Sequence, residues 1–190
     1  MPQIAIISSS VRNGRNTHRV ALFFKNYITE NNLGNAEILD LKAYNFPVFE
    51  ERLKNLENPP KGALGFAEKI KKADAVIVAT PEYNGGYPAS LKNVVDLLYD
   101  EWHRKPIGLV TVSAGSFGGM QVMRAIQFTF WKMHAWVVPA MFPVPKVASA
   151  YDENGTPTDK EASEKHAKHF MEEVLWCVEA KRKMEDKQKV

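Results

Sequence analysis

The segment AVIVATPEYNGGYPASLKNVVDLL, residues 75–98, carries the pattern that decides the fold. It opens with a continuous apolar run, Ala75–Ala79, which is typical of a β-strand buried on both faces. It closes with apolar residues at helical spacing, namely Leu91, Val94, Val95 and Leu98. Between the two, Asn84–Gly86 tolerates a positive φ, and Pro88 suits the first turn of a helix. The segment therefore predicts a strand, a tight loop and an amphipathic helix.

The same alternation extends through the rest of the chain. Ile4–Ile7, Ile107–Val112 and Ala135–Val138 are further continuous apolar runs, and we expect each to be a strand buried on both faces. Glu37–Leu41 alternates apolar and polar residues, which suits an edge strand. Apolar residues at helical spacing predict amphipathic helices over residues 20–28, 63–70 and 167–178.

Strict alternation of buried strands with helices predicts an α/β fold, because each parallel connection needs a crossover and such crossovers are right-handed. Five strands favour a flavodoxin-like three-layer sandwich, in which a five-stranded parallel sheet has the strand order 2-1-3-4-5. A chain of 190 residues has the length of one domain, so residues 1–190 are predicted to form a single flavodoxin-like domain.

Composition and charge narrow the class of protein. With 45% hydrophobic and 25% charged residues, the chain is an ordinary globular protein rather than a disordered or repetitive one. Its one cysteine, Cys177, excludes an internal disulfide and is expected to lie off the apolar stripe of the C-terminal helix.

No apolar run approaches the ~20 residues of a membrane span, and no secretory signal is visible, so we predict a cytoplasmic protein without membrane contacts. The basic stretch 181–189 is interpreted as a solvated helix end, not as a nucleic-acid surface.

The loop after the first strand, Ser8–Thr17, combines hydroxyls with two guanidinium groups. The next helix begins here, with Asn16 or Thr17 as its predicted N-cap. A helix N-terminus presents free N–H groups, and arginine matches the oxygens of a phosphate, so the loop predicts a phosphate site. A capped, solvated turn is the alternative. Neither the P-loop pattern nor the dinucleotide-binding glycine pattern is present.

Two further loops are expected at the same edge of the sheet. In such folds ligands bind beyond the carboxyl ends of the strands, at the switch point between the first and third. Pro81–Pro88 presents two flat side chains, Tyr83 and Tyr87, and residues 113–119 form a second glycine-rich loop that exposes backbone N–H groups. FMN joins a dianionic phosphate to a flat ring that needs such donors. The three loops therefore predict FMN as the cofactor.

These residues resemble a family, the NADPH-dependent FMN reductases, which include quinone, azo-dye and chromate reductases of the flavodoxin-like fold. Ser10–Arg15 is similar to the family's phosphate loop, Pro81–Ala89 to its flavin-ring loop, and Glu101–Pro106 to the stretch before its fourth strand. The resemblance covers nearly the whole chain. One departure is Ser116-Phe117, where some relatives carry a tyrosine or a histidine near the flavin.

The resemblance implies a role for each candidate residue. The FMN phosphate would be held by Ser10, Arg12, Arg15 and Thr17. The ring would be lined, largely through backbone groups, by Pro81, Glu82, Tyr83 and Asn84. The other edge of the ring would be closed by Ser113, Gly115, Ser116, Gly118 and Gly119. Gly85 would leave room above the ring for nicotinamide.

The sequence thus predicts an FMN-dependent NAD(P)H oxidoreductase. Hydride would pass from NADPH through FMN to quinone-like, azo or flavin acceptors in a ping-pong reaction, without a catalytic side chain, because the flavin carries the chemistry. No metal is expected, since His166 and His169 lack an evident third ligand and are interpreted as a solvated helix face. The alternatives are a flavodoxin-type electron carrier and a redox-sensing flavin protein. An isoelectric point of about 8.9 favours the enzyme, because such carriers tend to be acidic.

The segment Met120–Trp131 is apolar nearly all round, which exceeds what a helix packed on one face of a sheet needs. The excess predicts a homodimer, or a dimer of dimers, in which a second copy buries the exposed apolar surface. The resemblance implies in addition that the second chain walls the flavin pocket.

Overall fold

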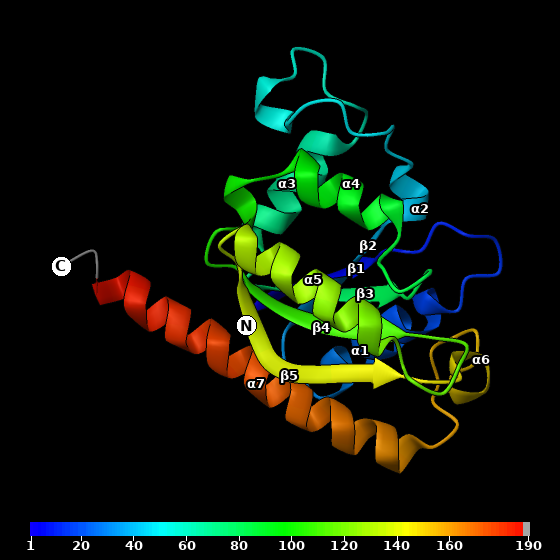
Figure 1. Ribbon diagram of the computed structural model, residues 1–190. Coiled ribbons are helices and arrows are strands. Elements are labelled where there is room, and N and C mark those ends of the chain that lie inside the picture. The colour runs from blue at the N-terminus through cyan, green and yellow to red at the C-terminus, as the bar shows by residue number, and fades with distance from the viewer. Residues whose placement is uncertain (188–190) are drawn as a thin grey trace.

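Five strands form one parallel sheet in the computed structural model, which describes residues 1–187 (Figure 1). The strands are β1 (Gln3–Ser8), β2 (Asn35–Asp40), β3 (Ala75–Pro81), β4 (Pro106–Val112) and β5 (Trp136–Val144). Their order is β2-β1-β3-β4-β5, and every neighbouring pair is parallel. The predicted flavodoxin-like α/β fold is confirmed, as is β2 at one edge. The end of the basic stretch, residues 188–190, lies outside the described residues.

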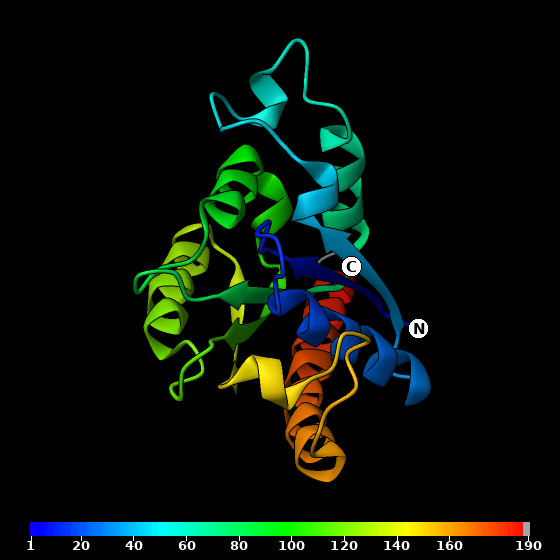
Figure 2. The same cartoon turned by 90° about the vertical axis from the view of Figure 1, so that its right-hand side faces the viewer.

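Helices cover both faces of the sheet and form the outer layers of the sandwich (Figures 1 and 2). One face packs against α1 (Thr17–Glu30) and α7 (Lys160–Lys187). The other face packs against α3 (Ala63–Lys72), α4 (Ala89–Leu97) and α5 (Met120–Lys132). The connections contain the short helices α2 (Leu41–Tyr44) and α6 (Val147–Ala150), and 3₁₀ turns at Leu53–Asn55 and Asp100–Trp102. None of the helices within residues 1–187 is both long and apolar enough to cross a membrane.

Alternate residues of the central strands contribute to two separate cores. Along β1, Ile4 and Ile6 belong to the core with α1 and α7, while Ala5 and Ile7 belong to the core with α3 and α4. Because helices cover both faces, almost every residue of β1, β3 and β4 is buried. This is why these strands are continuous apolar runs rather than alternating ones.

Gly108 in β4 allows a close approach of α7 to the sheet. A Cβ at this position would lie 2.7 Å from Cζ of Phe170 and 3.1 Å from Cγ2 of Val174. Both of these side chains belong to α7 and are fully buried. Glycine therefore lets the C-terminal helix lie directly on the strand, and a larger residue would push the two apart.

The prediction that Ala135–Val138 begins a strand buried on both faces is wrong. β5 lies at the edge of the sheet and alternates, so that only one of its faces joins the core with α1 and α7. On the other face Met141 is 45% exposed, and Trp136 at the start of the strand is 39% exposed. The position explains the difference, because a layer of helices covers an edge strand less completely than a central one.

Cys177 lies inside the apolar stripe of α7, contrary to the prediction. It is buried beside Val174 and Val178, and burial raises the pKa of its thiol. Position 177 follows Val174 by three residues, which is helical spacing, whereas Leu175 is only half-buried. Free cysteine packs as a small apolar side chain, and a pattern that counts it as polar misplaces it.

We expect Gly108→Ala to lower the free energy of unfolding by about 1–3 kcal/mol, because its methyl group would overlap Phe170. Gly65→Ala is the matched control. Gly65 lies within α3, no described atom outside its neighbours and the local helix backbone lies within 4 Å of where its Cβ would be, and alanine favours a helix over glycine by about 0.5–1 kcal/mol. Urea denaturation measures both variants. Equal stability of the two would contradict the close packing of α7 on β4.

Candidate functional site

The loops after β1, β3 and β4 meet at the carboxyl edge of the sheet, as the sequence predicts. They surround a hollow of about 320 Å³, which we call the edge hollow. The predicted site residues that line it are Ser10, Arg12, Arg15, Thr17, Pro81, Glu82, Tyr83 and Ser113. Ser10 Oγ and Tyr83 Oη lie 2.8 Å apart, so a hydrogen bond joins the loop after β1 to the loop after β3.

The N-terminus of α1 opens onto the edge hollow. Asn16 occupies the predicted N-cap position, but its side chain makes no capping hydrogen bond within the described structure. Asn16 and Thr17 both line the hollow. The first N–H groups of a helix have no partners inside the helix, and the helix dipole adds positive potential at this end. An uncapped helix N-terminus at a hollow is therefore suited to bind an anion.

The two arginines of this loop make different contacts. Arg15 forms a bidentate ion pair with Asp40, with both N···O distances at 2.5 Å, and donates to the carbonyl of Ser10 at 2.8 Å. The Arg12 guanidinium lies 5.5 Å from the centre of the Tyr83 ring and pairs with no carboxylate of residues 1–187. Arg15 therefore stabilises the loop, whereas Arg12 is available for an anion.

Asp40 is a residue of this site that the sequence analysis missed. It ends β2, and the parallel register places it beside Ser8 of β1. Burial by itself would raise the pKa of its carboxyl, but hydrogen bonds from Arg15 and from the Lys42 backbone outweigh burial, and the pKa is lowered. The carboxylate is thus ionised at neutral pH and holds Arg15. The sequence did contain a signal for this residue: an acidic side chain at the end of a strand that neighbours the arginine-containing loop could have been predicted to pair with an arginine.

His18 lies half-buried behind the loop, with Nδ1 3.0 Å from Oγ of Ser8. Burial lowers the pKa of its imidazole, and the positive charge of Arg15 lowers it further, against a smaller opposing effect of Asp40. The imidazole is therefore mainly uncharged at neutral pH. It adds little positive charge to the loop, which leaves Arg12 and the helix N-terminus as the groups that attract an anion.

Ser9 has hydrogen-bonding capacity that the described chain does not use. Its Oγ is the one buried side-chain polar atom of residues 1–187 without a hydrogen-bond partner. The backbone around it is fixed, because its N–H donates to the Ala79 carbonyl at 3.1 Å and its carbonyl accepts from Ser90 Oγ at 2.6 Å. A buried hydroxyl without a partner costs about 1–3 kcal/mol, so such atoms are rare in folded proteins and a bound group is one explanation for them.

The loop after β3 contains a tight turn. Tyr83 and Gly86 exchange two backbone hydrogen bonds, of 2.8 and 3.0 Å. Asn84 and Gly85 between them both have a positive φ, of 53° and 79°. This is the pattern of a type I′ turn, which Asn-Gly favours. No described atom outside the turn lies within 4 Å of where a Cβ on Gly85 would be, so the turn is open on that side.

The Glu82 carboxylate is directed toward α5. Its Oε2 accepts the backbone N–H groups of Gln121 and Val122, at 3.0 and 3.1 Å. The N–H of Glu82 itself donates to the carbonyl of Val112 at 3.1 Å, which extends the pairing of β3 with β4. One carboxylate oxygen of Glu82 is therefore used by α5, and the residue also lines the edge hollow.

The loop after β4 lines the hollow only in part. Ser113 donates its hydroxyl to the carbonyl of Gly115 at 2.9 Å. Gly118 and Gly119 have a positive φ, and a Cβ on either would lie 2.8 and 2.9 Å, respectively, from a neighbouring side chain. Backbone geometry and packing therefore require glycine at both positions. The predicted site residues that do not line the edge hollow are Asn84, Gly85, Gly115, Ser116, Gly118 and Gly119.

Further residues line the hollow that were not predicted: Asn13, Gly14, Asn16, Val112, Ala114 and Val147. Val147 comes from the connection after β5, and its N–H donates to the Ser113 carbonyl at 3.1 Å. The preceding N–H, of Lys146, donates to the Gly115 carbonyl at 2.9 Å. The sequence analysis considered the loops after strands one, three and four. Val147 could have been predicted to lie near the site, because the fifth strand of a parallel sheet ends at the same edge as the other four.

The described residues contain no group of three His, Cys, Asp or Glu side chains able to hold a metal ion. The expected solvated helix face is confirmed for His169, which is exposed, but His166 is half-buried. Its ring stacks on Phe142 with 4.2 Å between ring centres, and its Nε2 lies 3.1 Å from the Met141 carbonyl. His166 thus packs against the edge strand β5.

Fold and site together define a flavodoxin-like protein with a loop suited to bind an anion at the switch point between β1 and β3. The chain matches the family described as NADPH-dependent FMN reductase over residues 2–149, which is well over half its length. It therefore belongs to the NADPH-dependent FMN reductases, a family of oxidoreductases that use FMN with NAD(P)H as electron donor.

Individual proteins show the same relationship. The chain is 34% identical over 131 residues to a quinone reductase of Pseudomonas putida, covering 65% of this chain and 67% of that protein. It is 31% identical over 139 residues to an NAD(P)H-dependent FMN reductase of Saccharomyces cerevisiae, covering 66% and 71%. The solved structure of the NAD(P)H:acceptor oxidoreductase FerB from Paracoccus denitrificans superposes with a TM-score of 0.74 at 21% identity, covering 93% and 97%. The structural match shows the shared fold.

We expect Ser10→Ala and Tyr83→Phe to be coupled in their effect on stability. Each substitution removes one partner of the 2.8 Å hydrogen bond and leaves the other hydroxyl without it. The double variant should therefore lose less than the sum of the single losses, by about 0.5–1.5 kcal/mol. Denaturant unfolding of the FMN-free protein, wild type and the three variants, measures this coupling. Strictly additive losses would show that the two loops are not joined by this bond.

Proposed function

We propose that this protein is an FMN-dependent NAD(P)H oxidoreductase that passes hydride from NADPH through FMN to quinone-like, azo or flavin acceptors in a ping-pong reaction. The observation that carries the proposal is the edge hollow, where the uncapped N-terminus of α1 and the unpaired Arg12 lie beside the Tyr83 ring. The helix N-terminus and the arginine suit the phosphate of a flavin, and the tyrosine ring offers a flat neighbour for the flavin ring. Family membership supports the proposal, and the relatives include an NADPH azoreductase of a Bacillus strain.

The groups at the hollow fit the phosphate of FMN. Arg12, the hydroxyl of Thr17 and the first N–H groups of α1 are donors, as a dianion requires. The nearby carboxylate of Asp40 is neutralised by Arg15, so it does not repel the phosphate. Arg15 acts indirectly in this proposal, because it fixes the Ser10 carbonyl and with it the shape of the loop. Ser9 Oγ, which has no hydrogen-bond partner among residues 1–187, is an unused donor in the same loop, although Ser9 does not itself line the hollow.

The flavin ring would lie between the loop after β3 and the loop after β4. Bound FMN supplies the redox chemistry, accepting hydride from the nicotinamide and passing electrons to the acceptor. The protein would hold the ring through backbone groups of residues 81–84 and close its other edge with residues 113–119. Space is open at Gly85 and at Gly115, where no atom of the described chain outside the adjacent residues lies within 4 Å of where a Cβ would be. A flat donor or acceptor can approach there.

Ping-pong order follows if donor and acceptor use this one open side in succession. Few directed side chains surround it, so the site should discriminate poorly among flat acceptors. NADPH is the preferred donor in this proposal, because its additional phosphate is attracted to a chain with a net charge of +3.

Steady-state kinetics with a panel of quinones, an azo dye and free flavin, each with NADPH and NADH, test the proposed function. We expect parallel double-reciprocal lines and values of kcat/KM that lie within about two orders of magnitude for the quinones. Bound flavin that NADPH does not reduce would assign the protein to electron carriers. Reduction without turnover on any acceptor would favour a redox-sensing role.

We expect Arg12→Ala to raise the dissociation constant of FMN by roughly ten- to a hundredfold, because a charge-assisted hydrogen bond to phosphate is worth ~1.5–3 kcal/mol. Arg52→Ala is the matched control, since Arg52 also lies over a tyrosine ring, 4.3 Å from the centre of Tyr99, but away from the edge hollow. Titration of the FMN-free variants, followed by flavin fluorescence, measures both constants. The same constant for Arg12→Ala as for wild type would remove Arg12 from the phosphate site.

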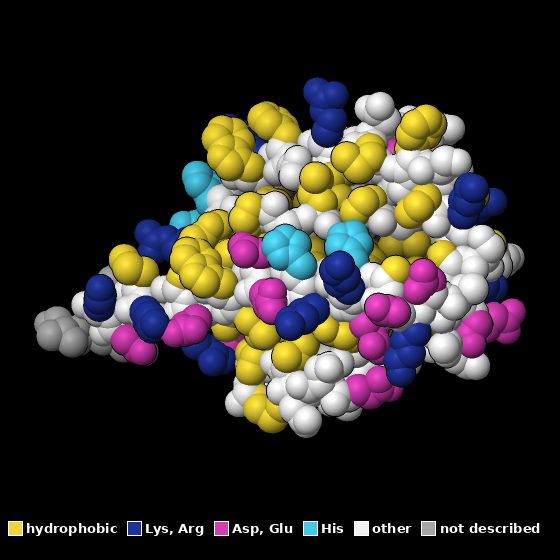
Figure 3. All heavy atoms as spheres, turned by 90° about the horizontal axis from the view of Figure 1, so that it is seen from below, with side chains coloured by type: hydrophobic (Ala, Val, Ile, Leu, Met, Phe, Trp, Pro, Cys, Tyr) yellow, Lys and Arg dark blue, Asp and Glu magenta, His cyan; other side chains and the backbone are white. Residues whose placement is uncertain are grey.

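The proposed assembly is a homodimer through α5 and β5. The outer side of α5 exposes Phe128 by 64% and Trp131 by 66%, and the edge strand β5 exposes Trp136 and Met141. Figure 3 shows hydrophobic side chains gathered on the face of the molecule that includes β5 and α7. Large aromatic side chains in contact with water are unfavourable, and a second copy would bury them in a two-fold interface.

Light scattering at micromolar concentration should give twice the chain mass of 21.5 kDa. Phe128→Glu should reduce the assembly to the monomer, because it places a charge in the interface. Leu64→Glu is the control, as Leu64 is 61% exposed on α3, away from β5. A wild-type monomer at this concentration would refute the dimer, and dissociation by Leu64→Glu instead of Phe128→Glu would move the interface to α3.

A further inference from the structure

α5 begins with a residue that cannot cap it. Gly119 at the N-cap position has φ 78° and ψ 36°, and a Cβ there would lie 2.9 Å from the side chain of Thr111. Serine, threonine, aspartate and asparagine, which usually cap helices, are excluded by this lack of space. Glu82 from the loop after β3 caps the helix instead, because its carboxylate accepts the N–H groups of Gln121 and Val122. A negative charge at this end also suits the helix dipole.

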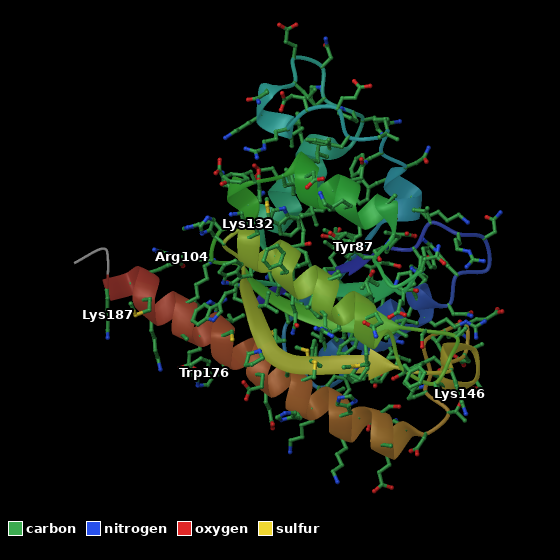
Figure 4. All side chains as sticks on the ribbon, in the orientation of Figure 1. Tyr87, Arg104, Lys132, Lys146, Trp176 and Lys187 are labelled. Atoms are coloured by element: carbon green, nitrogen blue, oxygen red, sulfur yellow. The ribbon has the colours of Figure 1, made fainter. Side chains whose placement is uncertain are left out.

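A second side chain of the same loop bonds to α5 farther along the helix. Tyr87 Oη lies 2.8 Å from Oγ1 of Thr129. Thr129 Oγ1 donates its own proton to the carbonyl of Ala125 at 3.2 Å, so Tyr87 is the donor in the bond to Thr129. Gln121 and Thr129 are eight residues apart, or about two turns. Figure 4 shows Tyr87 between α4 and α5.

The two links hold both ends of one loop. Residues 82–87, which we call the ring loop, begin with Glu82 and end with Tyr87, and both side chains bond to α5. The turn between them closes on itself through the bonds of Tyr83 with Gly86. Its other side-chain link is the bond of Tyr83 to Ser10. The position of the turn relative to the edge hollow is therefore set by α5 on one side and by the phosphate loop on the other.

We propose that Glu82 and Tyr87 are positioning residues that fix the ring loop on α5 and thereby set the affinity for FMN. The inference rests on the proposed function for its ligand. Both side chains make their bonds to α5 rather than toward the hollow: Glu82 Oε2 accepts the two backbone N–H groups of α5, and Tyr87 does not line the edge hollow.

Thr129→Val tests the link from the helix side, because it removes the partner of Tyr87 without altering the ring loop. Tyr87→Phe removes the same bond from the loop side. Thr29→Val is the matched control, since Thr29 makes the equivalent bond to a carbonyl four residues earlier, that of Lys25 in α1, and supports no loop. Glu82→Gln tests the other link, because it keeps the shape and loses the charge.

Two measurements are made on each variant. Hydrogen exchange of the FMN-free protein reports the protection of the Tyr83 and Gly86 amides, and fluorescence titration reports the dissociation constant of FMN. We expect Thr129→Val and Tyr87→Phe each to speed exchange of these amides and to raise the constant about three- to tenfold, with the double variant no worse than either. Glu82→Gln should act in the same direction. Thr29→Val should change neither quantity.

The inference is overturned if Thr129→Val leaves both quantities at their wild-type values, or if Tyr87→Phe alone weakens FMN, which would mean that Tyr87 contacts the ligand directly. Thermal unfolding of each variant checks that a change in exchange is local, since a global loss of stability would speed exchange in α3 as well. The exchange measurement needs no ligand. A wild-type protein that binds no FMN would therefore refute the proposed function, while exchange would still decide whether α5 holds the ring loop.

Discussion

Parallel pairing of β1 with β3 places Ser8 beside Ala79, and the N–H of Ser9 extends the ladder to the Ala79 carbonyl. From this point the chain continues into α1 on one face of the sheet and into α4 on the other. The two loops therefore diverge, and a hollow forms between them that a ligand can enter. The bond of Ser10 to Tyr83 spans the divergence. All further contacts of the candidate site depend on these two strands being neighbours.

The two arginines of the loop after β1 differ in their partners, and this difference separates a structural role from a binding role. Arg15 is neutralised by Asp40 and serves the loop itself, whereas Arg12 keeps its charge unpaired within the described chain. A loop with two free guanidinium groups would be less well ordered, because each would repel the other. The arginine bound to Asp40 orders the loop, and Arg12 is suited, together with the N–H groups at the start of α1, to bind an anion.

Glycine and glutamate have complementary roles on the other side of the hollow. Gly118 and Gly119 let the loop after β4 pass close to Thr111 and β5, but a glycine N-cap leaves α5 without a side-chain cap of its own. The acid that caps α5 comes from the loop after β3, which ties two of the three loops together. Constraints on the backbone of one loop thus determine which residue the neighbouring loop needs.

Local pattern by itself determined the strands, the helices and their order, because apolar periodicity within a segment records which of its sides is buried. It also located the three loops, since parallel strands all end at one edge, and residues as different as Arg12, Tyr83 and Ser113 do line one hollow. What only the tertiary structure decided are pairings between distant segments: Asp40 with Arg15, and Glu82 with α5. The partial exposure of β5 was also decided by the tertiary structure, because how completely helices cover a strand depends on the position of that strand in the sheet. These contacts depend on strand register and helix placement, neither of which leaves a mark in the spacing of neighbouring residues.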